Sequence, residues 1–279
     1  MKASKDCYEC LERLAYQAAE LATDDEHTRA SAIEQSLKVL SEDFSCDKVS
    51  IVIATKIHDV VKDVTQNPDP YRHMKDKEIA VARELSSEER LDNRNSFLGC
   101  LKFAALGNAI DFFRPLDDTR KDIKGRLDFT VDHSREFKAK LETASRVLYL
   151  ADNAGEVFFD LPLIKWMRQL ADVLYVVKAS PVQNDVTVEE VRRAGLENEL
   201  RRIMTTGTAT PGIDFSLASA EFKCEFAAAD LIFAKGMGYY ESISELPAEG
   251  RVFYCLKAKC RPVADSLGVP LDGYVAMLR

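Results

Sequence analysis

The feature that most constrains the fold is a set of short apolar runs in the second half of the chain. Each run has five residues or fewer, is too short for a buried helix, and is rich in β-branched or aromatic residues. Runs of this kind are typical of parallel strands that are buried on both faces. They lie at 147–151, 173–177, 203–204, 231–234 and 252–256.

Stretches that are long enough for crossover helices separate several of these runs, at 156–170, 186–194 and 215–228. Alternating strands and helices favour an α/β fold, because a parallel strand can be reached only by a crossover connection. We therefore predict a doubly wound, mostly parallel α/β/α sheet.

The first half of the chain has helical apolar spacing instead. Its stripes predict amphipathic helices over 8–21, 33–44 and 49–64, and two more helices are expected over 74–87 and 93–113. Pro68 and Pro70 interrupt this pattern and predict a loop at 66–71. Because the spacing of apolar residues changes near residue 140, we expect a helical N-terminal region over 1–135 and an α/β/α domain over 140–279.

Composition excludes several classes of protein. With 279 residues, 46% of them hydrophobic, the chain can bury a sizeable core and is not expected to be disordered. Its 38 Lys and Arg against 46 Asp and Glu give a net charge of −8, which disfavours nucleic acid as a partner. No apolar run is long enough to span a membrane, and the first ten residues show no apolar region behind their lysines, so a cytoplasmic protein without a membrane partner is expected.

Polar residues follow the predicted strands at the points where the strands end, which is where an open α/β sheet binds its ligands. Asp152 and Asn153 follow the first run, and Asp185 comes shortly after the second. Two carboxylates and an amide carbonyl form an oxygen set that suits a divalent ion such as Mg²⁺ or Mn²⁺. The alternative is that Asp152 and Asp185 only cap the helices that follow them.

Other residues near the strand ends predict anion binding. Gly155 and Glu156 open a helix, whose free N–H groups favour an anion, and Lys235 ends a strand beside a glycine. We expect Gly155, Lys178 and Lys235 to bind substrate, although a strand-end lysine can also be merely solvated. Asn108 and Asp111 share the face of an apolar helix, where they either contact substrate or form a buried polar link.

The seven cysteines are odd in number and do not indicate a disulfide framework. Cys7 and Cys10 form half of a zinc or redox motif, which Cys255 and Cys260 could complete as a separate four-sulfur site. The alternative is that these cysteines belong to the core.

Several of these segments together resemble the metal-dependent damage-control phosphatases, a family long known as a domain of unknown function and once labelled as protein-glutamate methyltransferases. The most specific matches are the segments 152–156 and 184–187, with further matches at Cys7 and Cys10, 69–71 with Lys75, 107–111, 211–212, Lys235 with Gly236 and Glu241, and 259–260. The pair of cysteines is similar to that of the prokaryotic and archaeal branch. In this chain 237–241 lacks the asparagine that the family often carries there.

The resemblance implies a phosphatase that hydrolyses a small phosphorylated metabolite, such as a sugar phosphate. It implies one divalent ion (Mg, Mn, Co or Ni) on Asp152, Asn153 and Asp185, with phosphate contacts from Lys235. For the attack we favour a metal-bound water over an aspartyl-phosphate on Asp152, with Glu156, Asp185 or Asp111 as candidate bases. Two alternatives are an S-adenosylmethionine-dependent methyltransferase and a non-catalytic, zinc-dependent interaction protein.

Overall fold

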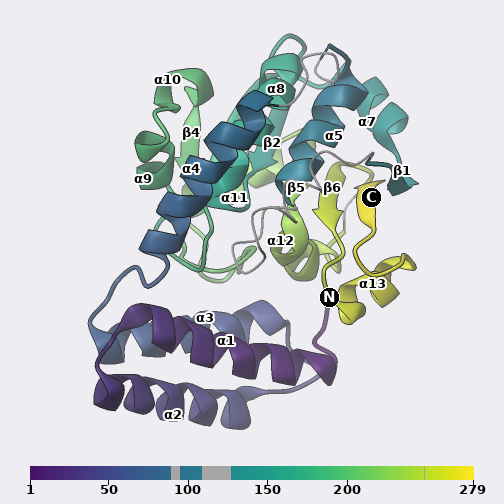
Figure 1. The fold of residues 1–279 in the computed structure, drawn as a ribbon. Coiled ribbons are helices and arrows are strands. Elements are labelled where there is room, and N and C mark those ends of the chain that lie inside the picture. Colours follow the sequence, from purple (N-terminus) through teal and green to yellow (C-terminus); the bar gives the residue numbers. More distant parts are fainter. Residues whose placement is uncertain (89–94, 109–126, 248) are drawn as a thin grey trace.

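A computed structural model of the chain describes residues 1–88, 95–108, 127–247 and 249–279. Within these residues, a helical N-terminal part is followed by a seven-stranded sheet with helices on both faces, which confirms the predicted α/β class (Figure 1). The N-terminal helices are α1 (Asp6–Ala22), α2 (Glu26–Asp43), α3 (Ser50–Thr65), α4 (Arg72–Glu88) and α5 (Phe97–Gly107).

The strands are β1 (Phe129–Asp132), β2 (Arg146–Leu150), β3 (Asp172–Val177), β4 (Ile203–Thr205), β5 (Leu231–Lys235), β6 (Val252–Lys257) and β7 (Tyr274–Leu278). The remaining helices are α7 (Ser134–Leu141), the 3₁₀ turn η2 (Ala154–Glu156), α8 (Val157–Met167), α9 (Val188–Arg193), α10 (Glu197–Leu200), α11 (Ala220–Ala228), α12 (Gly236–Ile243) and α13 (Arg261–Leu267).

The sheet has the order β1-β7-β6-β5-β2-β3-β4. All neighbouring pairs are parallel except β6 and β7, so the sheet is mixed rather than purely parallel. From β2 the chain proceeds outward through β3 and β4 on one side and through β5 and β6 on the other. The strand order therefore reverses between β2 and β5, and this topological switch point is where such sheets bind ligands.

Two apolar cores cover the two faces of the sheet. Tyr149 and Phe233 point to the face that packs against α5, α7 and α8, where Phe159 and Phe137 meet them. Their neighbours in the strands point to the opposite face, toward α11, α12 and α13. The side-chain alternation of buried strands thus produces the three layers.

Helices α1, α2 and α3 form a separate small core below the sheet domain, built on Leu11, Leu40 and Ile53 (Figure 1). The predicted loop before α4 is present, because α3 ends at Gln66 in the left-handed conformation and α4 begins only at Arg72. Lys75 of α4 is fully buried and pairs with Asp69 of that loop at 2.9 Å and with Glu190 of α9 at 2.8 Å. This ion-pair cluster ties the loop to the sheet domain.

The helices α4 and α5 do not lie with the three-helix unit but pack on the sheet domain, against η2 and α8 (Figure 1). Strand β1 forms one edge of the sheet although it precedes residue 135. The boundary between 135 and 140 stays a prediction.

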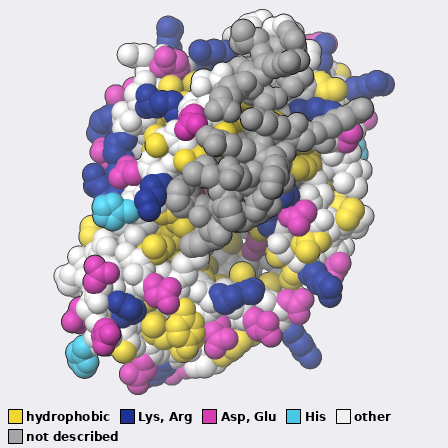
Figure 2. Space-filling view, in the orientation of Figure 1, with side chains coloured by type: hydrophobic (Ala, Val, Ile, Leu, Met, Phe, Trp, Pro, Cys, Tyr) yellow, Lys and Arg dark blue, Asp and Glu magenta, His cyan; other side chains and the backbone are white. Residues whose placement is uncertain are grey.

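Acidic and basic side chains are mixed on the face shown in Figure 2, and acidic ones are prominent over the three-helix unit. No helix among the described residues is both long and apolar enough to cross a membrane.

Candidate active site

A cavity of about 250 Å³ lies at the carboxyl ends of the strands around the switch point. Asp152 follows β2, Asp185 follows β3, and Met237 and Gly238 follow β5. The cavity is lined by Gln17, Tyr71, Glu78, Asn108, Asp152, Asn153, Gln183, Asn184, Asp185, Pro211, Gly212, Met237, Gly238, Lys257 and Lys259.

Two backbone hydrogen bonds hold the loops after β2 and β3 together. The Val186 N–H donates to the Asp152 carbonyl at 2.8 Å, and the Ala154 N–H donates to the Asn184 carbonyl at 2.8 Å. Asn153 and Asp185 therefore form an isolated bridge between the loops. This pairing places the predicted oxygen ligands Asp152, Asn153 and Asp185 in one cavity.

The alternative role of these aspartates as helix caps is not what the structure shows. Helix α9 is capped by Thr187, whose hydroxyl accepts from the Glu189 N–H at 3.1 Å in a capping box with Glu190. The turn η2 has Asn153, and not Asp152, at its N-cap, and no side chain caps it. The carboxylates of Asp152 and Asp185 are thus turned to the cavity rather than to helix ends.

The position of Asp152 depends on Gly236. A Cβ atom at residue 236 would lie 2.0 Å from Asp152 Oδ2, and the backbone there has a φ of +76°. Only glycine satisfies both conditions without strain, because it has no Cβ and tolerates positive φ. The glycine after β5 therefore provides the space for the carboxylate.

Negative charge in the cavity is incompletely balanced. Burial and the carboxylates of Glu156 and Asp185 raise the pKa of Asp152 well above its usual value, against a smaller opposing effect of Lys259 and Lys235. Burial also raises the pKa of Asp185, although Lys178 opposes this change. Two buried carboxylates that resist ionisation favour a bound cation, which would stabilise their charged forms.

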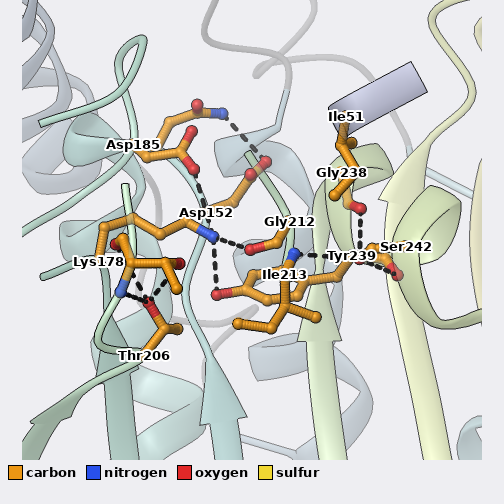
Figure 3. A network of polar contacts seen from close by, with 12 residues as sticks. Ile51, Asp152, Lys178, Asp185, Thr206, Gly212, Ile213, Gly238, Tyr239 and Ser242 are labelled. Atoms are coloured by element: carbon orange, nitrogen blue, oxygen red, sulfur yellow. Dashed lines mark hydrogen bonds and ion pairs between the residues drawn. The ribbon is translucent and has the colours of Figure 1, made fainter. Parts of the chain in front are cut away.

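Lys178 is not in the cavity lining, and Figure 3 shows its ammonium directed toward Asp185, Gly212 and Tyr239. Its Nζ donates to Tyr239 Oη at 3.0 Å and to the carbonyl of Gly212, and lies 3.4 Å from Asp185 Oδ2. Burial disfavours the ammonium, but Tyr239 and Asp185 outweigh that effect and raise the pKa of Lys178. The geometry thus gives Lys178 a supporting position under Asp185, whereas the sequence predicted contact with substrate.

Lys235 and Glu156 also lie outside the cavity lining, and both are fully buried. Lys235 Nζ is 2.8 Å from Glu156 Oε2 and 2.9 Å from Asp160 Oδ1, and it donates to the Ala104 carbonyl at 2.5 Å. Burial disfavours the ammonium, but Asp160 and Glu156 outweigh it and raise the pKa of Lys235. An ammonium enclosed in this way is not positioned to meet a phosphate in the cavity.

Asn108 combines the two roles that the sequence left open. It lines the cavity, and its amide Nδ2 donates to Glu156 Oε1 at 2.6 Å and to Oε2 at 2.5 Å, so it is also a buried polar link between the halves of the chain. Gly155 instead allows close packing, because a Cβ there would come within 3.1 Å of the Glu78 carbonyl oxygen. Asp111 lies outside the described residues.

Two cavity lysines received no role from the sequence, although position 259 was among the family matches. Lys257 ends β6 and pairs with Asp272 at 3.2 Å, and Lys259 follows it as an exposed residue that forms no ion pair with a described residue. The sequence did contain a signal for these lysines, because they follow the predicted run 252–256, which becomes β6 and ends at this same edge of the sheet. Gln17 of α1 was missed because the packing of α1 at the cavity has no local sequence signal, and Tyr71, although part of a family match, was given no role.

The cysteines do not assemble as the four-sulfur site that the sequence raised. Cys260 lies near Cys10 and Cys7, whose charges influence it, whereas Cys255 is buried in β6 near Lys235 and Asp160. Burial raises the pKa of Cys260 to about 11 and that of Cys255 to about 12, so both are neutral thiols at pH 7. All seven cysteines are free.

The residues of the cavity fit a divalent ion. Within the described ranges, no group of three or more His, Cys, Asp or Glu side chains is arranged as a metal cluster. The ligand set here is different, because it has two carboxylates and the amide oxygen of Asn153. The Asn153 Nδ2 donates to Asp152 Oδ2 at 3.1 Å and to Glu156 Oε1 at 2.7 Å, which leaves its Oδ1 available for a cation.

Comparison with known proteins agrees with the resemblance found in the sequence. The chain is 34% identical to the damage-control phosphatase PH1575 of Pyrococcus horikoshii over 285 residues, with 99% of this chain and 98% of that protein covered. It is 31% identical to a damage-control phosphatase of Archaeoglobus fulgidus over 285 residues, with 99% of each covered.

The fold is similar to the crystal structure of a DUF89 family protein of Pyrococcus horikoshii, with a TM-score of 0.89, 32% identity and coverage of 100% of this chain and 99% of that one. Residues 3–275 match the damage-control phosphatase ARMT1-like domain. With the whole chain matched in sequence and in fold, the protein belongs to the damage-control phosphatase family.

Proposed function

We propose that this protein is a metal-dependent phosphatase that hydrolyses the phosphomonoester of a small metabolite. The observation that carries the proposal is the pairing, in one cavity, of the oxygen set Asp152, Asn153 and Asp185 with the lysines 257 and 259. Oxygen ligands suit a hard divalent cation such as Mg²⁺, Mn²⁺, Co²⁺ or Ni²⁺, and ammonium groups suit a phosphate. When bound, the cation would act as a Lewis acid on a phosphoryl oxygen.

In this proposal the phosphate is bound by Lys259 and not by Lys235, for which the sequence predicted that role. Lys259 lines the cavity, influences Asp152 electrostatically, and is free of ion pairs with described residues. Its ammonium would neutralise charge on the phosphoryl oxygens, and Lys257 would add a second positive charge from the end of β6.

The size and lining of the cavity support a small substrate. About 250 Å³ is below the 300–1,000 Å³ that is usual for sites of drug-sized ligands. Beyond the lysines and carboxylates, the amides of Gln17, Gln183 and Asn184 can bind hydroxyl groups of the organic part, as expected for a sugar phosphate or a similar compound.

We further propose that water, rather than Asp152, attacks phosphorus. In this proposal the Asp152 carboxylate is a ligand of the cation and its Oδ2 also accepts from Asn153 Nδ2, so its lone pairs are engaged and less available for attack on phosphorus. Of the candidate bases, Glu156 has both oxygens occupied, whereas Asp185 lines the cavity and could take the proton of the water.

The test is a panel of phosphorylated metabolites assayed with Mg²⁺, Mn²⁺, Co²⁺ and Ni²⁺, before and after chelation. We expect chelation to abolish activity and added metal to restore it, and phosphatase activity that is indifferent to chelator would refute the proposal. Asp152→Asn should lose both activity and Mn²⁺ binding. Its control is Asp25→Asn, which changes an aspartate that caps α2 through the Thr28 N–H at 2.8 Å and should leave both unaffected.

Lys259→Gln separates phosphate binding from metal binding. We expect kcat/KM to fall by roughly 10²-fold while Mn²⁺ still binds, because the lost charge contacts the substrate and not the metal. Lys138→Gln, at a half-exposed lysine of α7 outside the cavity, is the control. The methyltransferase and interaction-protein alternatives have less support, since neither requires the combination of oxygen ligands and lysines.

A further inference from the structure

Buried polar side chains outside the cavity lining form one connected network, which the proposed chemistry does not use directly. Asp160 Oδ1 accepts from Tyr149 Oη at 2.7 Å and its Oδ2 from Tyr175 Oη at 3.1 Å. Lys235 then joins Asp160 to Glu156, with distances of 2.9 Å and 2.8 Å. The chain of contacts therefore runs from the core of the sheet to Glu156.

Glu156 connects this buried network to the residues that line the cavity. Its Oε1 accepts from Asn153 Nδ2 at 2.7 Å, and Asn108 Nδ2 donates to both of its oxygens. Asn108 in turn accepts from the Lys257 N–H at 3.4 Å, which connects Glu156 to the end of β6.

The charge of this network fixes which way the Asn153 amide faces. Its NH₂ group lies between two carboxylates, those of Asp152 and Glu156, and a carbonyl oxygen in the same place would be repelled by both. The Oδ1 atom is therefore directed away from them, where it can serve as the third oxygen ligand. Lys235 also compensates Glu156 and Asp160, so that Glu156 does not offer its own charge to the cation.

We propose that Glu156, held by Lys235 and Asn108, is a positioning residue that orients the Asn153 amide for metal binding and is not the catalytic base. This inference rests on the proposed metal dependence. Partners that orient a metal ligand typically contribute about 10- to 100-fold to metal affinity. The effect should therefore appear in Mn²⁺ binding without any substrate.

The experiment is a Mn²⁺ titration of the substrate-free protein, followed calorimetrically, for wild type and Glu156→Gln. Glutamine has the same shape but presents an NH₂ group of its own, so the Asn153 amide loses one of the two carboxylates that hold its NH₂ group and its orientation is less firmly set. We expect Mn²⁺ to bind about 10- to 100-fold more weakly, with kcat at saturating Mn²⁺ within a few-fold of wild type. A catalytic base would show the opposite pattern, in which affinity is retained and kcat is lost.

Glu190→Gln is the matched control. The Glu190 side chain has the same exposure as that of Glu156, 1%, and the same distance to a fully buried lysine, 2.8 Å, but it contacts Lys75 outside the cavity lining. Both variants should lose stability, and only Glu156→Gln should lose Mn²⁺ affinity. Asn108→Ala, which removes one amide donor from Glu156, is a second test. It should weaken Mn²⁺ binding by a smaller factor than Glu156→Gln does.

The outcomes separate this inference from the function on which it rests. If wild type binds no divalent ion, the metal-dependent function and the positioning role both fail. If wild type binds Mn²⁺ and both Glu156→Gln and Asn108→Ala bind it equally well, the positioning role alone is overturned. If Glu156→Gln fails to fold, the Mn²⁺ affinity of substrate-free Asn108→Ala tests the positioning role instead.

Discussion

Replacing Gly236 with alanine should displace Asp152 from its place in the proposed metal site. The new Cβ would lie 2.0 Å from Asp152 Oδ2, whereas real Cβ contacts are not shorter than 3.0 Å, so the carboxylate has to move by at least about 1 Å. A displacement of that size at a reacting centre can reduce the rate by about 10²-fold, which corresponds to about 2.7 kcal/mol of transition-state stabilisation. We expect kcat/KM of Gly236→Ala to fall by that factor.

The control for this variant is Gly268→Ala at the end of α13. Gly268 also has a positive φ, +66°, but a Cβ there would have no atom within 4 Å. Both variants should lose about 1–2 kcal/mol of stability from the strained backbone, measured by urea denaturation. Only Gly236→Ala should lose activity, measured with the best substrate of the panel at saturating metal. If the two variants retain the same kcat/KM, the contact between Gly236 and Asp152 does not determine the reaction.

Three further predictions concern stability and the cysteines. Burial lowers the pKa of His58 to about 3 from the 6.5 of the unfolded chain, so the unfolded chain takes up a proton as the pH falls through 6.5 and the folded chain does not. The free energy of unfolding should therefore fall by about 2 kcal/mol between pH 7.5 and pH 5, and urea denaturation of His58→Phe should lack this component of the loss. Lys75→Met removes a fully buried cation from Asp69 and from the buried Glu190, which keeps the Arg193 guanidinium at 2.6 Å, and should cost about 3–5 kcal/mol. The half-exposed Lys138→Met should cost less than about 1 kcal/mol, and equal losses of the two variants in thermal denaturation would refute the difference. The double variant Cys7→Ser and Cys10→Ser should keep most metal-dependent phosphatase activity and lose only thermal stability, because thiolates suit a Mg²⁺ or Mn²⁺ site poorly; a folded variant without turnover would place these cysteines in the active site.

The sequence alone determined the interior strands β2, β3, β5 and β6 and the residues at their ends, whereas it missed the interior strand β7. Buried parallel strands need apolar residues on both faces, so β2, β3, β5 and β6 are visible as local runs. The order of such a sheet brings their carboxyl ends to one edge, which predicted that Asp152, Asn153 and Asp185 would lie near one another. The edge strand β1 escaped prediction because alternate residues are exposed and its neighbours are charged.

Only the tertiary structure decided which polar groups face the cavity and which lie beneath it. Lys235 and Lys259 look alike in sequence, since each is a lysine at or just after the end of a strand. Lys235 is enclosed because α5 supplies the Ala104 carbonyl, and η2 and α8 supply carboxylates, at distances that no local pattern encodes. Lys259 stays exposed because it follows the last residue of β6 and no described carboxylate reaches it. Burial is a property of packing between distant segments, so the role of each lysine follows from the fold and not from its neighbours in the chain.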